Sequence, residues 1–138
     1  MEAPSYVISF YYRKILVPVD GSETSLKALL VAADIAMRYG SRLVVVYAKP
    51  RGVEEPVDPL ARARERLRGV PVNAAYKQIE YDPASESPSS ALLREVAEGG
   101  YDLVVVGARG RSLLGDINIG SVAVSIAISA PTSVFVVR

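Results

Sequence analysis

The residues in this sequence best suited to chemistry are three glycines and a serine near the C-terminal end. Gly107, Gly110 and Gly120 are spaced as G-x2-G-x9-G, and Ser121 follows the third glycine directly. Glycine lets backbone N–H groups approach a ligand without a Cβ in the way. A helix N-terminus beyond them would add unpaired N–H groups and a positive dipole end, which attract phosphate. A lone glycine would indicate only a turn, but this combination predicts an anion-binding loop.

Two elements must position this loop. The run at 103–106 is continuously apolar, which predicts a short strand buried on both faces. The stretch SVAVSIAISA after the loop predicts a helix that ends before Pro131. The loop is not a P-loop, because no lysine follows Gly120. It is not the dinucleotide fingerprint either, because its first two glycines are three residues apart.

A second loop carries a carboxylate. Pro18 ends an apolar strand predicted at 14–20, because proline cannot donate to a sheet ladder. The turn Asp20-Gly21-Ser22 follows, and Ser22 is a suitable N-cap for the next helix. Asp20 is the one carboxylate that the sequence places with assurance beside the glycine loop, provided that the two loops meet.

The elements alternate between strand and helix along the whole chain. Strands are predicted at 14–20, 42–48, 70–79, 103–106 and 132–137, the third at a sheet edge. Helices are predicted at about 23–39, about 58–68, from Ser89 or Ser90 to Gly99-Gly100, and at 121–130. Such alternation predicts an α/β fold, a parallel sheet with helices on both faces, of the flavodoxin-like class. Ligands in such sheets bind where the strand order reverses, so the two loops would face each other if the strands at 14–20 and 103–106 flank the reversal.

Composition narrows the classes of function. The chain has 138 residues, half of them hydrophobic, which favours one domain with a proper core. A net charge of +1 predicts neither a nucleic-acid partner nor a membrane partner. The absence of cysteine and histidine excludes thiolate metal sites, cysteine nucleophiles and the commonest general base. Without a secretory signal or a run of about 20 apolar residues, we expect a cytoplasmic protein.

Two segments stand apart from this plan. Residues 1–13 hold four of the ten aromatic side chains, so they form either an arm packed on the body or a partner, or a loose terminus. The domain proper is predicted at 14–138.

The helix predicted at about 58–68 carries an arginine at every second residue, at Arg62, Arg64, Arg66 and Arg68. That spacing spreads them around the helix, so a solvated surface is favoured over a nucleic-acid patch.

At this point the sequence resembles the universal stress protein family. The segments that carry the resemblance are KILVPVDGSETS at 14–25 and VVVGARGRSLLGDINIGSVA at 104–123. The second contains the complete G-x2-G-x9-G-[ST] signature of the ATP-binding branch of that family. The resemblance covers nearly the whole chain from Lys14.

The resemblance implies strand order 3-2-1-4-5 and an ATP site. The implied contacts are Pro18, Val19, Asp20 and Ala48 by the adenine and ribose, Val106 and Gly107 on the ribose side, and Gly110, Gly120, Ser121 and Val122 at the phosphates. It also implies a homodimer through the last strand, at Val134, Phe135, Val136 and Val137. Arg109 and Arg111 lie within the glycine loop and either pair with phosphates or remain exposed.

The function expected is therefore an ATP-binding, nucleotide-dependent regulatory dimer in the stress response, with any Mg²⁺ held through the phosphates. A slow ATPase is one alternative, although the missing histidine, P-loop lysine and paired acidic motif count against it. Asp116 is a weaker candidate there for holding a metal or water. The other alternative is a dimeric protein-interaction module with a structural nucleotide.

Overall fold

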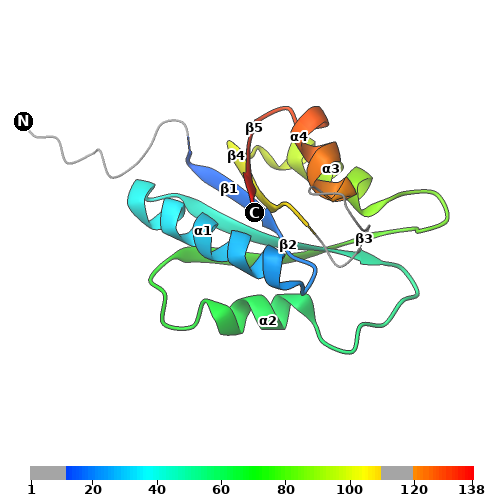
Figure 1. Ribbon diagram of the computed structural model, residues 1–138, viewed down its shortest axis with the longest axis horizontal. Helices are drawn as coiled ribbons and strands as arrows, with labels where there is room; N and C mark the ends of the chain where they lie inside the picture. The colour runs from blue at the N-terminus through cyan, green and yellow to red at the C-terminus, as the bar shows by residue number, and fades with distance from the viewer. Residues whose placement is uncertain (1–11, 110–119) are drawn as a thin grey trace, which may run out of the picture.

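The computed structural model describes residues 12–109 and 120–138. Its elements in chain order are β1 (Lys14–Pro18), α1 (Glu23–Tyr39), β2 (Arg42–Pro50), α2 (Pro59–Arg66), β3 (Asn73–Tyr81), α3 (Pro88–Gly99), β4 (Leu103–Gly107), α4 (Ser121–Ser129) and β5 (Ser133–Val137). The strands form one parallel sheet of order β3-β2-β1-β4-β5 (Figure 1). The predicted α/β class and strand order are confirmed.

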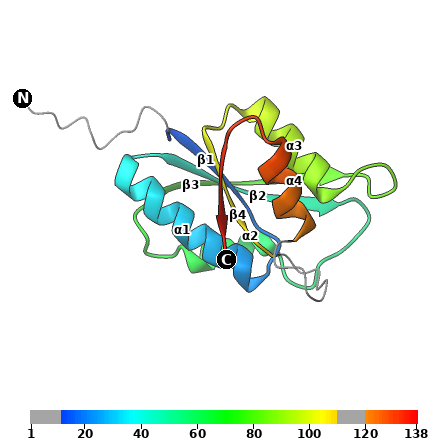
Figure 2. The ribbon, with the colours of Figure 1, turned by 45° about the horizontal axis from the view of Figure 1, so that its top comes forward.

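The sheet is covered on both faces. Helices α1 and α2 lie on one face, and α3 and α4 lie on the other (Figure 2). Alternate residues of β1 feed the two cores, with Ile15 and Val17 on the α1 side and Leu16 on the α3 side. All three are fully buried, and each contributes about 1.5–3 kcal/mol by leaving water. This two-sided burial explains why the central strands are continuously apolar rather than alternating.

Helix α1 has the bounds that its sequence predicts, because its ends are determined locally. The Ser22 hydroxyl accepts a hydrogen bond from the Ser25 N–H at 3.1 Å and caps the first turn. Gly40 ends the helix in the left-handed conformation, with φ 66°. Both signals lie within a few residues of the ends that they define.

The strands β2 and β3 are longer at their carboxyl ends than predicted. They pair in register from Arg42 opposite Asn73 to Pro50 opposite Tyr81. The predicted start of β3 at Val70 is wrong, because the Val70 N–H donates to the Leu67 carbonyl and continues the turn after α2. The predicted edge position of β3 is confirmed.

Helix α3 begins at Pro88, one residue before the earlier of its two predicted starts. Its N-cap is Ser87, whose hydroxyl accepts from the Ser90 N–H at 3.1 Å, and proline suits the position after a cap. The other bounds differ from prediction by no more than two residues.

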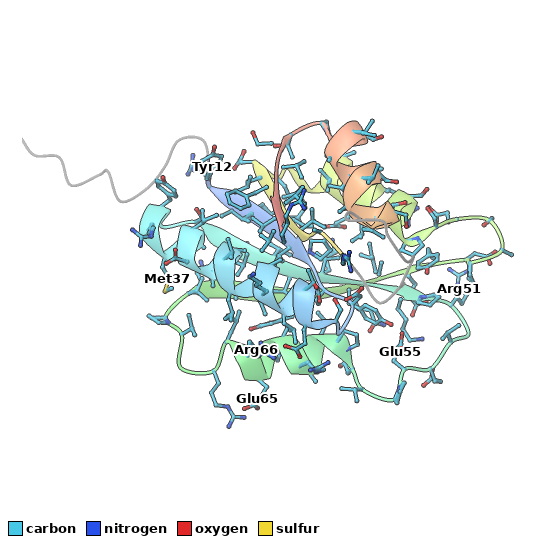
Figure 3. The ribbon with its side chains drawn as sticks, in the orientation of Figure 1. Tyr12, Met37, Arg51, Glu55, Glu65 and Arg66 are labelled. Carbon is cyan, nitrogen blue, oxygen red and sulfur yellow. The ribbon has the colours of Figure 1, made fainter. Side chains whose placement is uncertain are left out.

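The start of the described chain packs on the end of α1. The rings of Tyr12 and Tyr39 have centroids 5.8 Å apart, and the Tyr12 carbonyl accepts from the Ser41 hydroxyl. Tyr12 lies above the end of α1 in Figure 3. Residues 1–11 lie outside the described part, so the prediction of an arm at 1–13 stays a prediction. None of the described helices combines the length and the apolar character that crossing a membrane requires.

Candidate functional site

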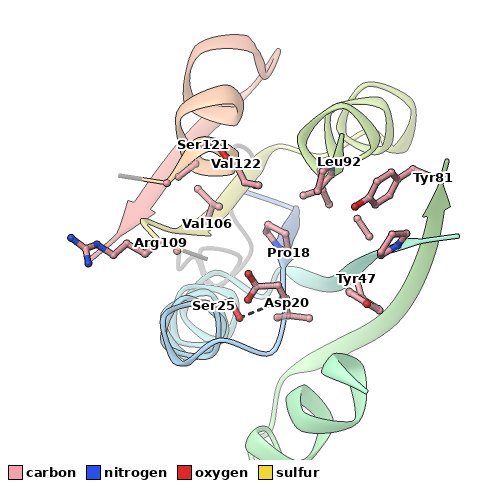
Figure 4. Close-up of a pocket in the computed structure, with 17 residues that line it drawn as sticks. Pro18, Asp20, Ser25, Tyr47, Tyr81, Leu92, Val106, Arg109, Ser121 and Val122 are labelled. Atoms are coloured by element: carbon pink, nitrogen blue, oxygen red, sulfur yellow. Dashed lines mark hydrogen bonds between the residues drawn. The ribbon is translucent and has the colours of Figure 1, made fainter. Parts of the chain in front are cut away.

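A cavity of about 320 Å³ opens at the carboxyl ends of the central strands (Figure 4). Strand β1 pairs with β2 on one side and β4 on the other, so the strand order reverses here. The lining residues come from the ends of four strands and from three helices or their first turns. They are Pro18, Val19, Asp20, Ser25, Tyr47, Ala48, Pro50, Tyr81, Pro88, Leu92, Val106, Gly107, Arg109, Gly120, Ser121, Val122 and Ala123.

The turn after β1 brings a carboxylate to the rim. Asp20 Oδ1 accepts from the Ser22 N–H at 2.9 Å, and the Asp20 N–H donates to the Ser25 hydroxyl at 3.3 Å (Figure 4). The Ser25 hydroxyl in turn donates to the Ser22 carbonyl at 2.9 Å. Gly21 lies between them with φ +86°, a conformation that side chains disfavour. These local bonds hold Asp20 against the start of α1.

One end of the cavity is apolar and aromatic. Tyr47 from β2, Tyr81 from β3 and Leu92 from α3 gather there (Figure 4). The Tyr47 side chain is buried, and its hydroxyl donates at 3.1 Å to Glu55, which Figure 3 labels on the loop after β2. Aromatic and aliphatic walls of this kind suit a flat apolar ligand group.

The opposite end is lined by the first turn of α4. Gly120 is the N-cap and contributes no capping side chain, and its N–H donates to the Ala108 carbonyl. The next three N–H groups, of Ser121, Val122 and Ala123, have no intrahelical acceptor, because helical geometry provides none. These groups and the positive end of the helix dipole can receive an anion.

Gly107 has a packing role that the sequence pattern did not indicate. A Cβ at this position would lie 2.9 Å from the Thr24 carbonyl oxygen and 3.1 Å from Thr24 Cγ2. Helix α1 therefore approaches the end of β4 so closely that only glycine fits without a shift. The sequence suggested ligand approach alone as the reason for this glycine.

Arg109 lies on the surface at the α4 end. Its guanidinium extends away from the aromatic end of the cavity (Figure 4). It also lines a second hollow of about 160 Å³ with Thr24, Ala108 and Arg138. Of the described residues that line the main cavity, Asp20 and Arg109 carry a charge. The positions of Gly110, Arg111 and Asp116 fall outside the described residues.

The fold thus brings together ten of the eleven predicted site residues, nine of them implied by the resemblance and the tenth being Arg109. The eleventh, Gly110, lies outside the described residues. The contacts of all eleven with a nucleotide stay a prediction. The sequence reasoning missed Ser25, Tyr47, Pro50, Tyr81, Pro88, Leu92 and Ala123. Tyr47, Pro50 and Tyr81 follow the rule that ligands lie beyond carboxyl strand ends, so that signal was present. Leu92 carried no such signal, because its spacing marked it as a core residue.

A buried polar group lies one turn along α3 from Leu92. Glu95 is nearly buried, and Oε2 accepts from the Tyr101 hydroxyl at 2.8 Å and from Lys77 Nζ at 3.0 Å. Burial, followed by the hydrogen bond to Glu95, raises the pKa of Tyr101 well above its usual value. Across residues 12–109 and 120–138, no cluster of three or more acidic, histidine or cysteine side chains could hold a metal ion.

Comparison with known proteins places this chain in a family. The universal stress protein family matches residues 11–138. A universal stress protein of Thermus aquaticus is 30% identical over 136 residues, which cover 92% of this chain and 99% of that protein. A universal stress protein solved in complex with cAMP is 24% identical, with a TM-score of 0.72 and coverage of 93% and 98% of the two chains.

A universal stress protein from Archaeoglobus fulgidus, solved in complex with dAMP, is 21% identical. Its TM-score is 0.71, and the match covers 94% of this chain and all of that one. At these identities, the two structural likenesses show a shared fold. The sequence match over nearly the whole chain goes further, and it shows that this protein belongs to the universal stress protein family.

Proposed function

We propose that this protein binds ATP in the cavity at the carboxyl ends of β1 and β4. The observation that carries the proposal is the difference in chemical character between the two ends of that cavity. Its two ends differ as the two ends of a nucleotide do, with tyrosines and aliphatic side chains at one end and helix N–H groups at the other. A site with one apolar slot and a few convergent polar groups is typical of cofactor binding.

The adenine lies in the slot beside Tyr47 and Ala48, over Pro18 and Val19. The Asp20 carboxylate accepts hydrogen bonds from the ribose hydroxyls, since a carboxylate has room for several donors.

The phosphates lie against the first turn of α4. There Gly120 presents no side chain, Ser121 adds a hydroxyl, and Val122 adds an N–H group. Mg²⁺, when present, is held mainly by the phosphate oxygens. An adenine nucleotide is supported by the two fold relatives solved with cAMP and dAMP. The choice of ATP rests on the resemblance of the glycine and serine spacing to the signature of the ATP-binding branch of the family.

We propose that ATP acts here as a regulatory ligand in the stress response of a homodimer. Strand β5 is at the edge of the sheet, and Phe135 on it is 48% exposed. Ile128 at the end of α4 is 78% exposed. An apolar edge strand is a ready surface for pairing with a second copy, which supports a dimer through Val134 to Val137. Release of ADP over many turnovers would favour the slow ATPase instead.

The test is nucleotide binding by the wild type and a Gly120→Val variant. Protein freshly purified from cells is extracted with acid, and ATP, ADP and AMP are separated by chromatography. Calorimetry then measures the Kd for added ATP. We expect Gly120→Val to weaken ATP binding at least about tenfold, because the valine side chain occupies the position of a phosphate.

The matched control is Ser129→Val at the exposed far end of the same helix. It introduces the same side chain into α4 without approaching the cavity, so we expect wild-type affinity. Circular dichroism checks that both variants are folded. Unchanged ATP affinity in folded Gly120→Val protein would show that the assigned phosphate position is wrong.

A further inference from the structure

The arginines of α2 have partners inside the molecule. Arg62 and Arg66 lie one turn apart and both pair with Glu23 of α1, at 3.1 Å and 3.5 Å between Nη2 and the carboxylate oxygens. Arg66 lies on the side of α2 that faces α1 (Figure 3). Arg64 lies instead over the ring of Tyr76, with Cζ 4.5 Å from its centroid. The arginines therefore diverge around the helix, as their spacing predicts, but each of these three contacts another element.

Arg62 makes a second contact, with the turn after β1. Its Nη1 donates a hydrogen bond to the carbonyl of Gly21, in the turn that carries Asp20. The same turn is approached by Pro59, whose Cγ lies 3.9 Å from the position of a Cβ at Gly21. Helix α2 therefore contacts the turn through a charged donor, with a proline ring nearby.

The position of helix α2 is fixed by its N-cap and by its buried side chains. Its first turn is capped by Asp58, which accepts from the Leu60 N–H at 3.0 Å. Leu60 and Ala63 are buried in the core on the α1 face of the sheet. The Arg62 side chain is 38% exposed, so its hydrogen bond to the turn is partly shielded from water. A guanidinium held this way presents its donors in a fixed direction.

We infer that Arg62 is a positioning residue for the nucleotide, which acts by holding Asp20 toward the ribose. The inference rests on the proposed function. The dipeptide Asp20-Gly21 is held at both ends, because the Asp20 N–H donates to Ser25 and the Gly21 carbonyl accepts from Arg62. Without Arg62, the Gly21 carbonyl loses its charged donor. Glycine can then adopt other backbone angles at little cost. These angles would move the Ser22 N–H, which belongs to the same peptide group as the Gly21 carbonyl and donates to Asp20 Oδ1, and would turn the carboxylate away with it.

The test compares two ligands, ATP and 2′,3′-dideoxy-ATP, which lacks both ribose hydroxyls. Calorimetry measures the Kd of each for the wild type and Arg62→Gln. We expect Arg62→Gln to weaken ATP binding roughly three- to tenfold, the usual effect of losing a hydrogen bond with a charged partner. Dideoxy-ATP should bind both proteins equally, because it makes no contact with Asp20. Arg62→Lys, which keeps a charge but not the guanidinium fork, should lose affinity for ATP alone, and by less.

Two controls separate the contact with the turn from the ion pair. Arg66→Gln removes one guanidinium from Glu23 and leaves Arg62 in place. Glu23→Gln removes the carboxylate charge that pairs with both arginines, and it leaves the hydrogen bond from Arg62 to Gly21. Both variants should bind ATP as the wild type does. A loss in either control equal to that of Arg62→Gln would overturn the inference, since the ion pair would then be the cause.

The remaining outcomes are distinct. Failure of the wild type to bind ATP would overturn the proposed function and this inference with it. Normal ATP binding by both Arg62 variants would overturn the inference alone. Equal losses for ATP and dideoxy-ATP would also overturn it, because the effect would not pass through Asp20. If Arg62→Gln is unstable by thermal melting, the comparison is made with Arg62→Lys.

Discussion

Replacing Gly107 by alanine should destabilise the protein even when no nucleotide is present. The new Cβ would lie 2.9 Å from the Thr24 carbonyl oxygen, 3.0 Å from its carbonyl carbon and 3.1 Å from its Cγ2. Two of these three atoms belong to the backbone of α1, so no rotation of a side chain relieves them. Either α1 or the end of β4 must move by a few tenths of an ångström within a close-packed interior.

The expected cost is that of overpacking, about 1–3 kcal/mol. For a domain of this length, each kcal/mol lowers Tm by roughly 4 °C, so the expected fall is roughly 4–12 °C. Thermal melting and urea titration of nucleotide-free protein measure it. Thr24→Ala removes Cγ2 but keeps the carbonyl group, so adding it to Gly107→Ala should restore only a small part of the loss.

Gly107→Ala also separates two reasons for the glycine. If α1 requires it, the nucleotide-free protein loses stability. If only a ligand requires it, nucleotide-free stability is unchanged and the Kd for ATP rises. An unchanged Tm and urea midpoint in nucleotide-free Gly107→Ala protein would refute the packing argument.

Two further predictions concern the buried polar group and the sheet edge. The pKa of Tyr101 is raised in the folded state, so its contribution to stability is complete below its unfolded pKa of about 10 and is lost at higher pH. Urea midpoints of Tyr101→Phe should therefore fall less steeply than wild type above pH 10, and equal slopes would count against the raised pKa. Phe135→Glu should convert a dimer into a monomer in analytical ultracentrifugation, because it places a charge on the exposed edge strand. Val57→Glu, at a similarly exposed apolar residue on the loop between β2 and α2, is the control and should stay dimeric. A monomeric wild type would refute the interface.

Elements with local signals could be predicted from the sequence closely. The ends of α1 depend on Ser22 and Gly40, which act on groups within the same turn. The apolar runs of β1 and β4 report burial on both faces, and the alternation of elements then allows few topologies. With the strand order that the family resemblance implies, β1 and β4 flank the reversal, so Asp20 and the first turn of α4 could be expected at one site in advance.

The parts that could not be predicted depend on neighbours distant in the chain. The extent of β3 is determined by its register with β2, where Pro50 pairs with Tyr81. The inclusion of Leu92 in the cavity depends on where α3 lies across the sheet. The spacing of the arginines predicted only that they diverge, and the choice of Glu23 and Gly21 as partners of Arg62 came from the packing of α2 beside α1.

The sequence by itself determined which segments form strands and helices, because hydrophobic periodicity and caps act over a few residues. Only the tertiary structure decided the reason for Gly107, the aromatic end of the cavity at Tyr47 and Tyr81, and the contact of Arg62 with the turn. Each of these depends on how closely two elements approach. That distance is determined by the packing of the whole core and is not encoded in any one segment.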